Sequence, residues 1–198
     1  MNFEPQLPNW GYELAQKKLD ILIKYHSWLK ETGIKTGLIS QKNDQFIWDE
    51  FIVHSLYFSI VFQELEIKNK TIFDLGTGGG IPGIPLAITS NNLISLIDIK
   101  ESRINELIRL KNILNLDNIK PTLEDANKTI VKEGLFVSRC YISTENALNL
   151  LKNKENSTYV VSSADKETEY DSEKFHVKHL NFYINKEDLR HIDVITVK

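Results

Sequence analysis

The chain has 198 residues, of which 41% are hydrophobic and 26% charged, enough for one domain with a real core and a modest extension. Its 24 Lys and Arg residues against 27 Asp and Glu residues give a net charge of −3, which excludes a polybasic protein that binds nucleic acid by bulk charge. The single cysteine, Cys140, excludes a disulfide scaffold and a two-cysteine zinc or redox motif. The first residues lack the pattern of a signal peptide, and the longest apolar stretch, residues 51–62, is too short to span a bilayer. We therefore expect a cytoplasmic protein.

The first third of the chain reads as helical. Apolar residues recur at three- and four-residue steps from Leu19 to Leu29, which predicts an amphipathic helix. Residues 33–43 contain two glycines and several polar residues, so they predict a loop, and a second helix is expected over residues 44–65. All three tryptophans lie in this region, where we expect them to pack in the core rather than stack on bases. We assign residues 1–66 to an N-terminal helical extension.

The rest of the chain, residues 67–198, is assigned to an α/β domain. Short β-rich runs alternate with helical patterns, which predicts a parallel sheet flanked by helices. Helices are expected after Pro82 and over residues 101–115 and 144–151. The last two strands leave little room for a helix between them and are expected to form an antiparallel hairpin. The predicted strands are residues 71–75, 93–98, 119–123, 135–138, 158–162, 175–183 and 193–197.

The most informative stretch is residues 71–83, where an apolar strand containing Asp74 leads into a glycine run and then Pro82. Glycines let the backbone turn sharply and approach a ligand closely. The loop and the helix start that follows offer amide donors to an anion, either a phosphate or a carboxylate. A plain tight turn is the alternative, but the strand before the loop and the helix after it favour a cofactor site.

Two cofactor classes use such a loop. Nicotinamide enzymes place GxGxxG directly after the strand, and from Gly76 this pattern fails at Ile81. S-adenosylmethionine enzymes place an acid before alternating glycines, and here Asp74 precedes Gly76, Gly78 and Gly80. A carboxylate ahead of the glycines would oppose a pyrophosphate, whereas it suits the ammonium and sulfonium groups of S-adenosylmethionine. The motif therefore favours S-adenosylmethionine.

Asp98 ends the next apolar run. An acid at the tip of the second strand accepts hydrogen bonds from the ribose hydroxyls of an adenosine. Glu101 lies three residues further on, so a helix N-cap in a capping box is the alternative. Position and spacing favour the ribose role. Residues 124–127, at the third strand tip, are candidates to bracket the adenine.

The run from Asp74 to Ala87 resembles the signature of the bacterial glucose-inhibited division protein B family, whose members are 16S ribosomal RNA methyltransferases that make 7-methylguanosine. The continuation Pro-Gly-Ile-Pro-Leu-Ala, which starts at Pro82, is more specific than the glycines alone. The resemblance implies a Rossmann-like class I S-adenosylmethionine-dependent methyltransferase sheet, with helices on both faces and an N-terminal helical extension. It implies an enzyme that methylates a guanine ring nitrogen in 16S ribosomal RNA, on naked RNA or on the small ribosomal subunit. We expect a monomer with no metal and no membrane contact.

The resemblance also assigns roles to residues. Arg139, at the fourth strand tip, is the candidate catalytic residue, expected to orient cofactor or nucleic acid, with a surface ion pair as the alternative. The attacking ring nitrogen carries a free lone pair, so catalysis is expected from alignment and electrostatics rather than from a general base. The expected cofactor-binding residues are Asp74, Gly76, Gly78, Gly80, Ile81, Asp98, Ala126, Asn127 and Arg139.

The chain also departs from the family pattern. The family's His-x-x-Asp-Ser-Leu has Phe51 and His54 at its two polar positions, and Leu-Lys-Gly after the fifth strand is replaced at residues 161–163. Asn127 stands where an acid is expected in the adenine loop. A catalytically altered or retargeted RNA-binding relative is therefore the second hypothesis, and a nicotinamide-dependent oxidoreductase is the third. Basic residues in the 100–120 stretch are candidates for phosphate contacts or for a solvated helix face.

Overall fold

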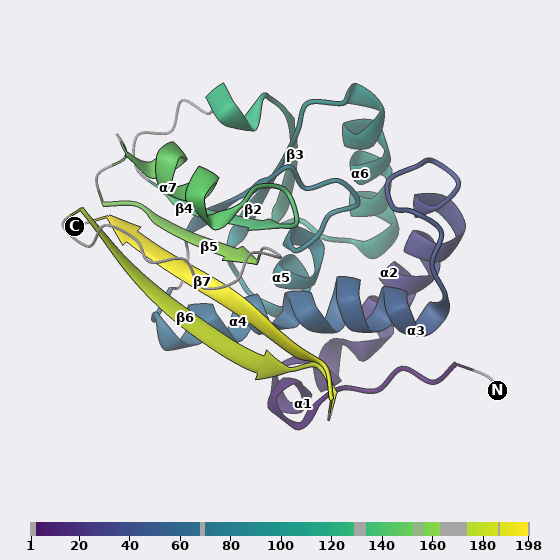
Figure 1. Ribbon diagram of the computed structural model, residues 1–198. Coiled ribbons are helices and arrows are strands. Elements are labelled where there is room, and N and C mark those ends of the chain that lie inside the picture. The colour runs from purple at the N-terminus through teal and green to yellow at the C-terminus, as the bar shows by residue number, and fades with distance from the viewer. Residues whose placement is uncertain are drawn as a thin grey trace.

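The predicted alternation of strands and helices is present in the computed structural model (Figure 1), which describes residues 3–67, 70–128, 134–152, 154, 156–162, 174–185 and 187–197. Within these residues, seven strands form one sheet in the order β3-β2-β1-β4-β5-β7-β6. Strands β1 to β5 are parallel, and β7 runs antiparallel between β5 and β6, so the predicted hairpin is confirmed. The strands are β1 (Thr71–Leu75), β2 (Leu93–Asp98), β3 (Ile119–Leu123), β4 (Leu135–Arg139), β5 (Thr158–Ser162), β6 (Phe175–Tyr183) and β7 (Leu189–Val197).

The predicted helices are also present. The helix expected over residues 44–65 is continuous, and its middle part, η3, has the wider hydrogen bonding of a π-helix. The helix expected after Pro82 starts at Gly83. The N-terminal helices are α1 (Asn9–Ala15), η1 (Gln16–Lys18), α2 (Leu19–Trp28), η2 (Leu29–Gly33), α3 (Asp44–Phe46), η3 (Ile47–Val53) and α4 (His54–Glu64). The later ones are α5 (Gly83–Thr89), α6 (Glu101–Leu114), η4 (Ala126–Lys128) and α7 (Thr144–Leu151).

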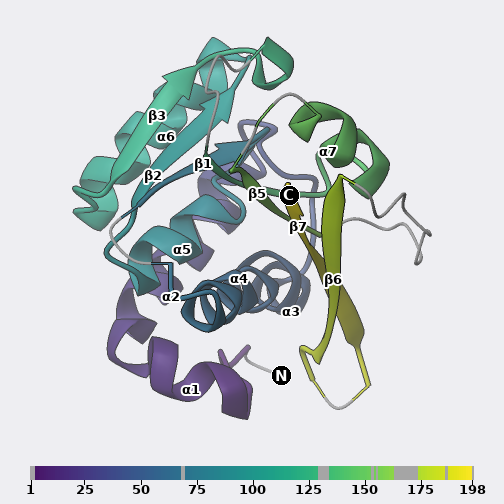
Figure 2. The same cartoon turned by 90° about the vertical axis from the view of Figure 1, so that its left-hand side faces the viewer.

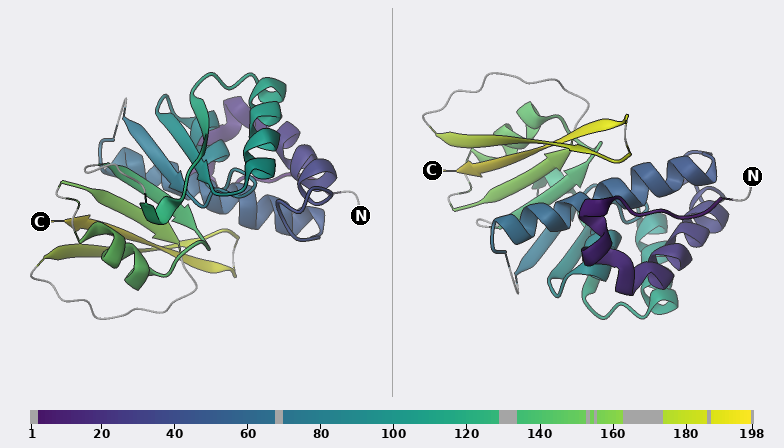
Figure 3. Two further views of the ribbon diagram at one scale, coloured as in Figure 1. Left: turned by 90° about the horizontal axis from the view of Figure 1, so that it is seen from above. Right: turned by 90° about the horizontal axis from the view of Figure 1, so that it is seen from below.

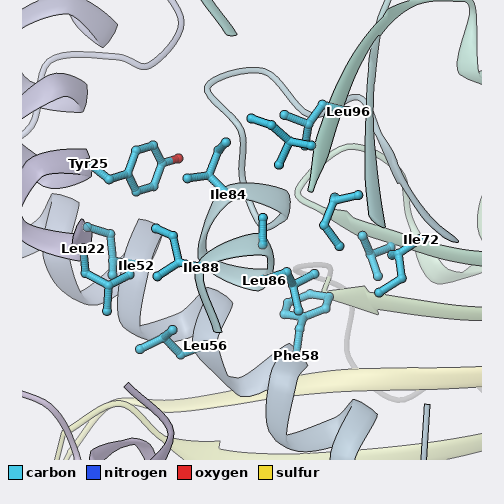
Figure 4. Packing of buried hydrophobic residues seen from close by; sticks show 14 of the residues in the cluster. Leu22, Tyr25, Ile52, Leu56, Phe58, Ile72, Ile84, Leu86, Ile88 and Leu96 are labelled. Atoms are coloured by element: carbon cyan, nitrogen blue, oxygen red, sulfur yellow. The ribbon is translucent and has the colours of Figure 1, made fainter. Parts of the chain in front are cut away.

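Helices cover both faces of the sheet, as expected. On one face, Leu56 of α4 and Ile84 of α5 pack in the same hydrophobic cluster as Leu96 of β2 (Figure 4). Seen from below, the N-terminal helices lie in front of the sheet (Figure 3), and Leu22 of α2 belongs to the same cluster. Helix α7 lies on the opposite face (Figure 2), where it packs in a second cluster that includes Phe136. The N-terminal helices and the sheet thus share one continuous core.

The tryptophans pack as expected. Trp48 is fully buried and Trp28 nearly so, while Trp10 packs edge-on against Tyr57, with ring centroids 5.1 Å apart. Two strand boundaries differ from prediction, and β4 ends at Arg139, one residue later than expected. Strand β7 begins at Leu189 rather than at residue 193, because its first residues pair with the end of β6. None of the helices in the described part of the chain has the length and apolar character needed to cross a membrane.

The strand order creates the site. Strand β1 lies between β2 and β4, so the loop after β1 and the loop after β4 meet at the point where the strand order reverses. In open α/β sheets, ligands bind in the crevice at the carboxyl ends of the strands at this switch point. Asp74 and Arg139 are placed at that edge by β1 and β4 respectively.

Candidate active site

The glycine loop leaves β1 through three residues in the left-handed region of backbone conformation. Gly76, Gly78 and Gly80 have φ angles of +69°, +56° and +92°. The amide of Thr77 donates to the carbonyl of Ile97 in β2 (3.0 Å), which fixes the loop to the neighbouring strand. The predicted turn at the carboxyl end of β1 is therefore confirmed, and its backbone geometry favours glycine. Ile81 also lies in this turn, where its amide donates to the carbonyl of Thr77 (3.0 Å).

Asp74 holds the loop from the inside. Its Oδ2 accepts hydrogen bonds from the Thr77 hydroxyl (2.5 Å) and from the Gly83 amide (2.9 Å). A Cβ on Gly83 would lie 2.3 Å from Leu96 and 2.6 Å from Asp74 Oδ2, so this glycine lets the helix start touch the carboxylate. The expectation that the helix start offers its amides to an external anion is wrong for Gly83, because Asp74 already takes that donor.

Asp74 is also electrostatically unusual. It is fully buried, and its Oδ1 has no hydrogen-bond partner. Burial raises the pKa of Asp74 to about 7, and the nearby charge of Asp98 adds to the rise. A buried carboxylate oxygen without a donor suits a cationic ligand group better than an anionic one.

The raised pKa predicts a pH-dependent stability. Asp74 binds its proton more tightly in the folded protein than in the unfolded chain, where its pKa is near 4. The stability gained from this is therefore complete below pH 4 and is lost as the pH rises through the folded-state pKa of about 7. Between pH 5 and pH 8 the wild type should lose about 3 kcal/mol of unfolding free energy relative to Asp74→Asn, whose amide does not titrate. Urea unfolding of both proteins at the two pH values measures this. If the unfolding free energies of wild type and Asp74→Asn change by the same amount between the two pH values, Asp74 has an ordinary pKa.

Asp98 lies beside the loop at the end of β2. Its Oδ2 accepts from the Gly78 amide (3.2 Å) and from Arg103 Nη1 (2.9 Å), and its Oδ1 accepts from the Lys100 amide (2.9 Å). The N-cap of α6 is Lys100 and has no side-chain hydrogen bond, so the N-cap alternative for Asp98 is wrong. A carboxylate can accept about four hydrogen bonds, and Asp98 accepts three in this structure. One of the three donors is Arg103, whose side chain is partly exposed and can give way to a ligand hydroxyl.

The third strand tip supplies Ala126 and Asn127 in the short helix η4. Ala126 is buried against the cluster that includes Phe136, whereas Asn127 is exposed. The amide of Asn127 donates to Asp125 Oδ1 (3.0 Å), which closes the turn. The structure thus places both predicted residues at the same edge of the sheet as the glycine loop.

Tyr141 is a residue of this edge that the sequence analysis missed. A Cβ on Gly76 would lie 2.1–2.6 Å from three ring atoms of Tyr141, so the ring lies directly on this glycine. Burial raises the pKa of Tyr141, the charges of Asp125 and Asp98 raise it further, and Asn127 opposes the rise. Tyr141 therefore lies on the loop after β1, close to the residues that follow β3 and within the electrostatic influence of Asp98 of β2. An aromatic residue directly after a strand tip was the available signal.

Arg139 lies at the tip of β4, as predicted, but its side chain is only 7% exposed. Its Nη2 donates to Oε2 of Glu50 (2.8 Å), and its guanidinium lies 5.5 Å from the ring centroid of Phe51. The ion pair considered as the alternative is present, but it is buried rather than at the surface. The partner, Glu50, was also missed, since nothing local in the sequence links it to a strand 89 residues away.

Two departures from the family pattern meet in the structure. His54 lies in the segment where the resemblance leads one to expect His-x-x-Asp-Ser-Leu, and Ser162 lies in the segment where it leads one to expect Leu-Lys-Gly. The Ser162 hydroxyl and His54 Nε2 form a hydrogen bond (2.9 Å), and both side chains are buried. Burial lowers the pKa of His54 to about 4, so the pair is neutral at pH 7.

The basic residues of the 100–120 stretch mostly have local partners. Arg103 pairs with Asp98, Arg109 pairs with Glu106, and Lys111 donates to a backbone carbonyl. Within the described residues, no group of three or more His, Cys, Asp and Glu side chains is arranged to hold a metal ion.

Comparisons with known proteins agree with this geometry. The family model described as "rRNA small subunit methyltransferase G" (GidB) matches residues 18–192. "Ribosomal RNA small subunit methyltransferase G" of Flavobacterium johnsoniae is 32% identical over 155 residues, covering 78% of this chain and 70% of the relative. The protein of the same name from Streptomyces coelicolor is 29% identical over 116 residues, or 58% of this chain.

The match covers 47% of the length of the Streptomyces coelicolor relative, so it spans about half of that protein. Among solved structures, a putative O-methyltransferase from Klebsiella pneumoniae has a TM-score of 0.60 at 9% identity, covering 96% of this chain and 94% of its own. That likeness shows the fold. Since the family model extends from the N-terminal helices to the last strand of the sheet, the chain belongs to the rRNA small subunit methyltransferase G family.

Proposed function

We propose that this protein is an S-adenosylmethionine-dependent methyltransferase that methylates a guanine ring nitrogen, giving 7-methylguanosine, in 16S ribosomal RNA. The choice of S-adenosylmethionine as cofactor rests on the hydrogen bond from the Gly83 amide to buried Asp74. A dinucleotide enzyme needs the amides at this helix start for a pyrophosphate. Here a carboxylate takes that place, which argues against the nicotinamide hypothesis. The choice of ribosomal RNA as substrate rests on the family to which the chain belongs.

The residues at the edge of the sheet fit S-adenosylmethionine. Asp74 offers a buried oxygen without a donor, which suits a ligand that carries an ammonium group. The three glycines in the left-handed region keep side chains away from the ligand. Asp98 accepts a hydrogen bond from the Gly78 amide and so lies next to this loop. We propose the binding set Asp74, Gly76, Gly78, Gly80, Ile81, Asp98, Ala126, Asn127 and Arg139.

The bound cofactor would supply a methyl group on a positively charged sulfur. A ring nitrogen of guanine attacks with its own lone pair, so the protein need not remove a proton first. The task of the chain is then to align the two reactants and to keep water out of the site. We propose Arg139 as the residue that orients cofactor or RNA at the tip of β4.

The remaining assignments are proposals on the same basis. Residues 1–66 form the helical extension and residues 67–198 the methyltransferase domain. The partner is 16S ribosomal RNA or the small ribosomal subunit, and the protein acts as a cytoplasmic monomer. The neutral pair of His54 and Ser162, in segments where the resemblance leads one to expect charged residues, favours a retargeted RNA-binding relative as the second candidate.

Calorimetric titration with S-adenosylmethionine and with NAD, on the same preparation, tests the cofactor class. We expect saturable one-to-one binding of S-adenosylmethionine and none of NAD at the same concentration. Binding of NAD alone would contradict the proposal. Binding of S-adenosylmethionine without any RNA methylation would favour the second candidate.

A further inference from the structure

One carboxylate in the N-terminal helices is shared by two arginines of the sheet. Glu50 lies in η3, and its side chain is 13% exposed. Its Oε2 accepts from Arg139 Nη2 of β4 (2.8 Å), and its Oε1 accepts from Arg190 Nε of β7 (3.1 Å) and from Arg190 Nη2. A single side chain thus ties the helical layer to two strands.

The guanidinium of Arg139 takes its orientation from this helix. Glu50 pairs with one edge of it, and the next residue, Phe51, lies against its face. Its Nε is buried and has no hydrogen-bond partner within the described part of the chain. Burying an unpaired donor of a charged group costs about 1–3 kcal/mol or more, so this donor is available for a ligand at the tip of β4.

The surroundings of Glu50 keep its carboxylate ionised at neutral pH. Burial would raise its pKa, but the hydrogen bonds and charges around it, those of Arg190 and Arg139 among them, hold the pKa of Glu50 at about 2. His54 Nδ1 lies 3.7 Å from Oε2, too far for a hydrogen bond, and His54 itself is neutral at pH 7. The cluster at neutral pH therefore contains one negative and two positive side chains, with Glu50 at its centre.

We propose that Glu50 is a positioning residue for methyl transfer. It fixes the Arg139 guanidinium so that its free Nε faces the reacting groups, and the N-terminal helices thereby complete the site at the carboxyl edge of the sheet. This inference rests on the proposed function, in which Arg139 orients cofactor or RNA. A buried ion pair kept only for stability would be replaceable by apolar residues of similar volume.

A double-mutant cycle on the full-length protein separates positioning from stability. Glu50→Gln keeps the shape of the side chain and removes its charge, and Arg139→Ala removes the group that Glu50 is proposed to hold. We expect each variant to lower kcat/KM for 16S RNA by at least about tenfold, and the double variant to be within about twofold of Arg139→Ala alone. Glu50→Asp, which keeps the charge on a shorter stem, should recover part of the loss.

The matched control is Glu106→Gln, which removes a carboxylate about as buried as Glu50 and paired with one exposed arginine, Arg109 of α6, and which should leave kcat/KM unchanged. Thermal unfolding of every variant sets an assay temperature at which all are folded. If Glu50→Gln does not fold, Glu50→Asp and Arg139→Lys complete the same cycle.

The outcomes distinguish this inference from the proposed function. A wild-type protein that does not methylate 16S RNA overturns the proposed function and the inference with it. An active wild type with Glu50→Gln within twofold of it overturns the inference alone. Effects of Glu50→Gln and Arg139→Ala that multiply in the double variant also overturn it, because the two residues would then act independently.

Discussion

Replacing Gly76 with alanine is expected to weaken S-adenosylmethionine binding by at least about 100-fold and to destabilise the protein by a few kcal/mol. Gly76 has a φ of +69°, which strains any side chain, and its Cβ would lie 2.1 Å from Tyr141 Cδ2. The ring of Tyr141 must move away, and the loop at the end of β1 must shift with it. Calorimetric titration gives the affinity, and urea unfolding gives the stability.

Gly37 provides the matched control for that variant. Its φ of +70° is the same within a degree, but a Cβ there meets nothing within 4 Å. Gly37→Ala should therefore cost only the backbone strain, about 1–2 kcal/mol, and leave cofactor affinity unchanged. The double variant Gly76→Ala/Tyr141→Ala removes the clash and should return to the stability of Gly37→Ala. Equal effects of the two single alanine variants would show that Tyr141 does not crowd Gly76.

Replacing Asp98 with alanine is the second change with a large expected effect. The carboxylate accepts from the Gly78 amide (3.2 Å), and we propose it as the group that binds the ribose hydroxyls. We expect Asp98→Ala to weaken S-adenosylmethionine binding by about 100-fold, since a buried hydrogen-bonded carboxylate and its ligand contacts are lost together. Binding of S-adenosylhomocysteine, which keeps the ribose, should fall by a similar factor.

Arg103→Gln separates the ribose contact from the ion pair. Arg103 Nη1 donates to Asp98 Oδ2 (2.9 Å), so this variant removes the pair but keeps the acid. It should retain cofactor affinity within about threefold, because in the proposed complex a ribose hydroxyl takes the place of Arg103 at the carboxylate. If Arg103→Gln loses as much affinity as Asp98→Ala, the arginine rather than the ribose contact explains the effect.

The sequence predicted the sheet closely because each strand is a short apolar run bounded by polar or glycine residues. The boundaries of β1, β2, β3, β5 and β6 agree with the prediction, and β4 is one residue longer. Strand β7 begins earlier than predicted because the pairing of Leu189 with Tyr183 extends it, although its first residues are polar. The glycine loop was predictable because its glycines and the acid before it are adjacent in the chain.

The rest of the site depends on tertiary contacts between distant segments. Glu50 and Arg139 are 89 residues apart, and no local pattern pairs them. The same holds for His54 and Ser162, which are 108 residues apart. The expectation for the helix start was wrong because an acid of the chain itself competes for its first amide. Tyr141 was overlooked because packing against Gly76 gives it its role.

Methyl transfer to RNA shows directly whether this protein methylates a guanine of 16S ribosomal RNA. Wild-type protein would be incubated with methyl-labelled S-adenosylmethionine and 16S RNA, or small subunits, from a strain that lacks the gene. We expect incorporation of label into a guanine ring of this RNA, and less incorporation into RNA from the parent strain, where the position is already methylated. Identical methylation of 16S RNA in the two strains, with no incorporation in vitro, would contradict the proposed function.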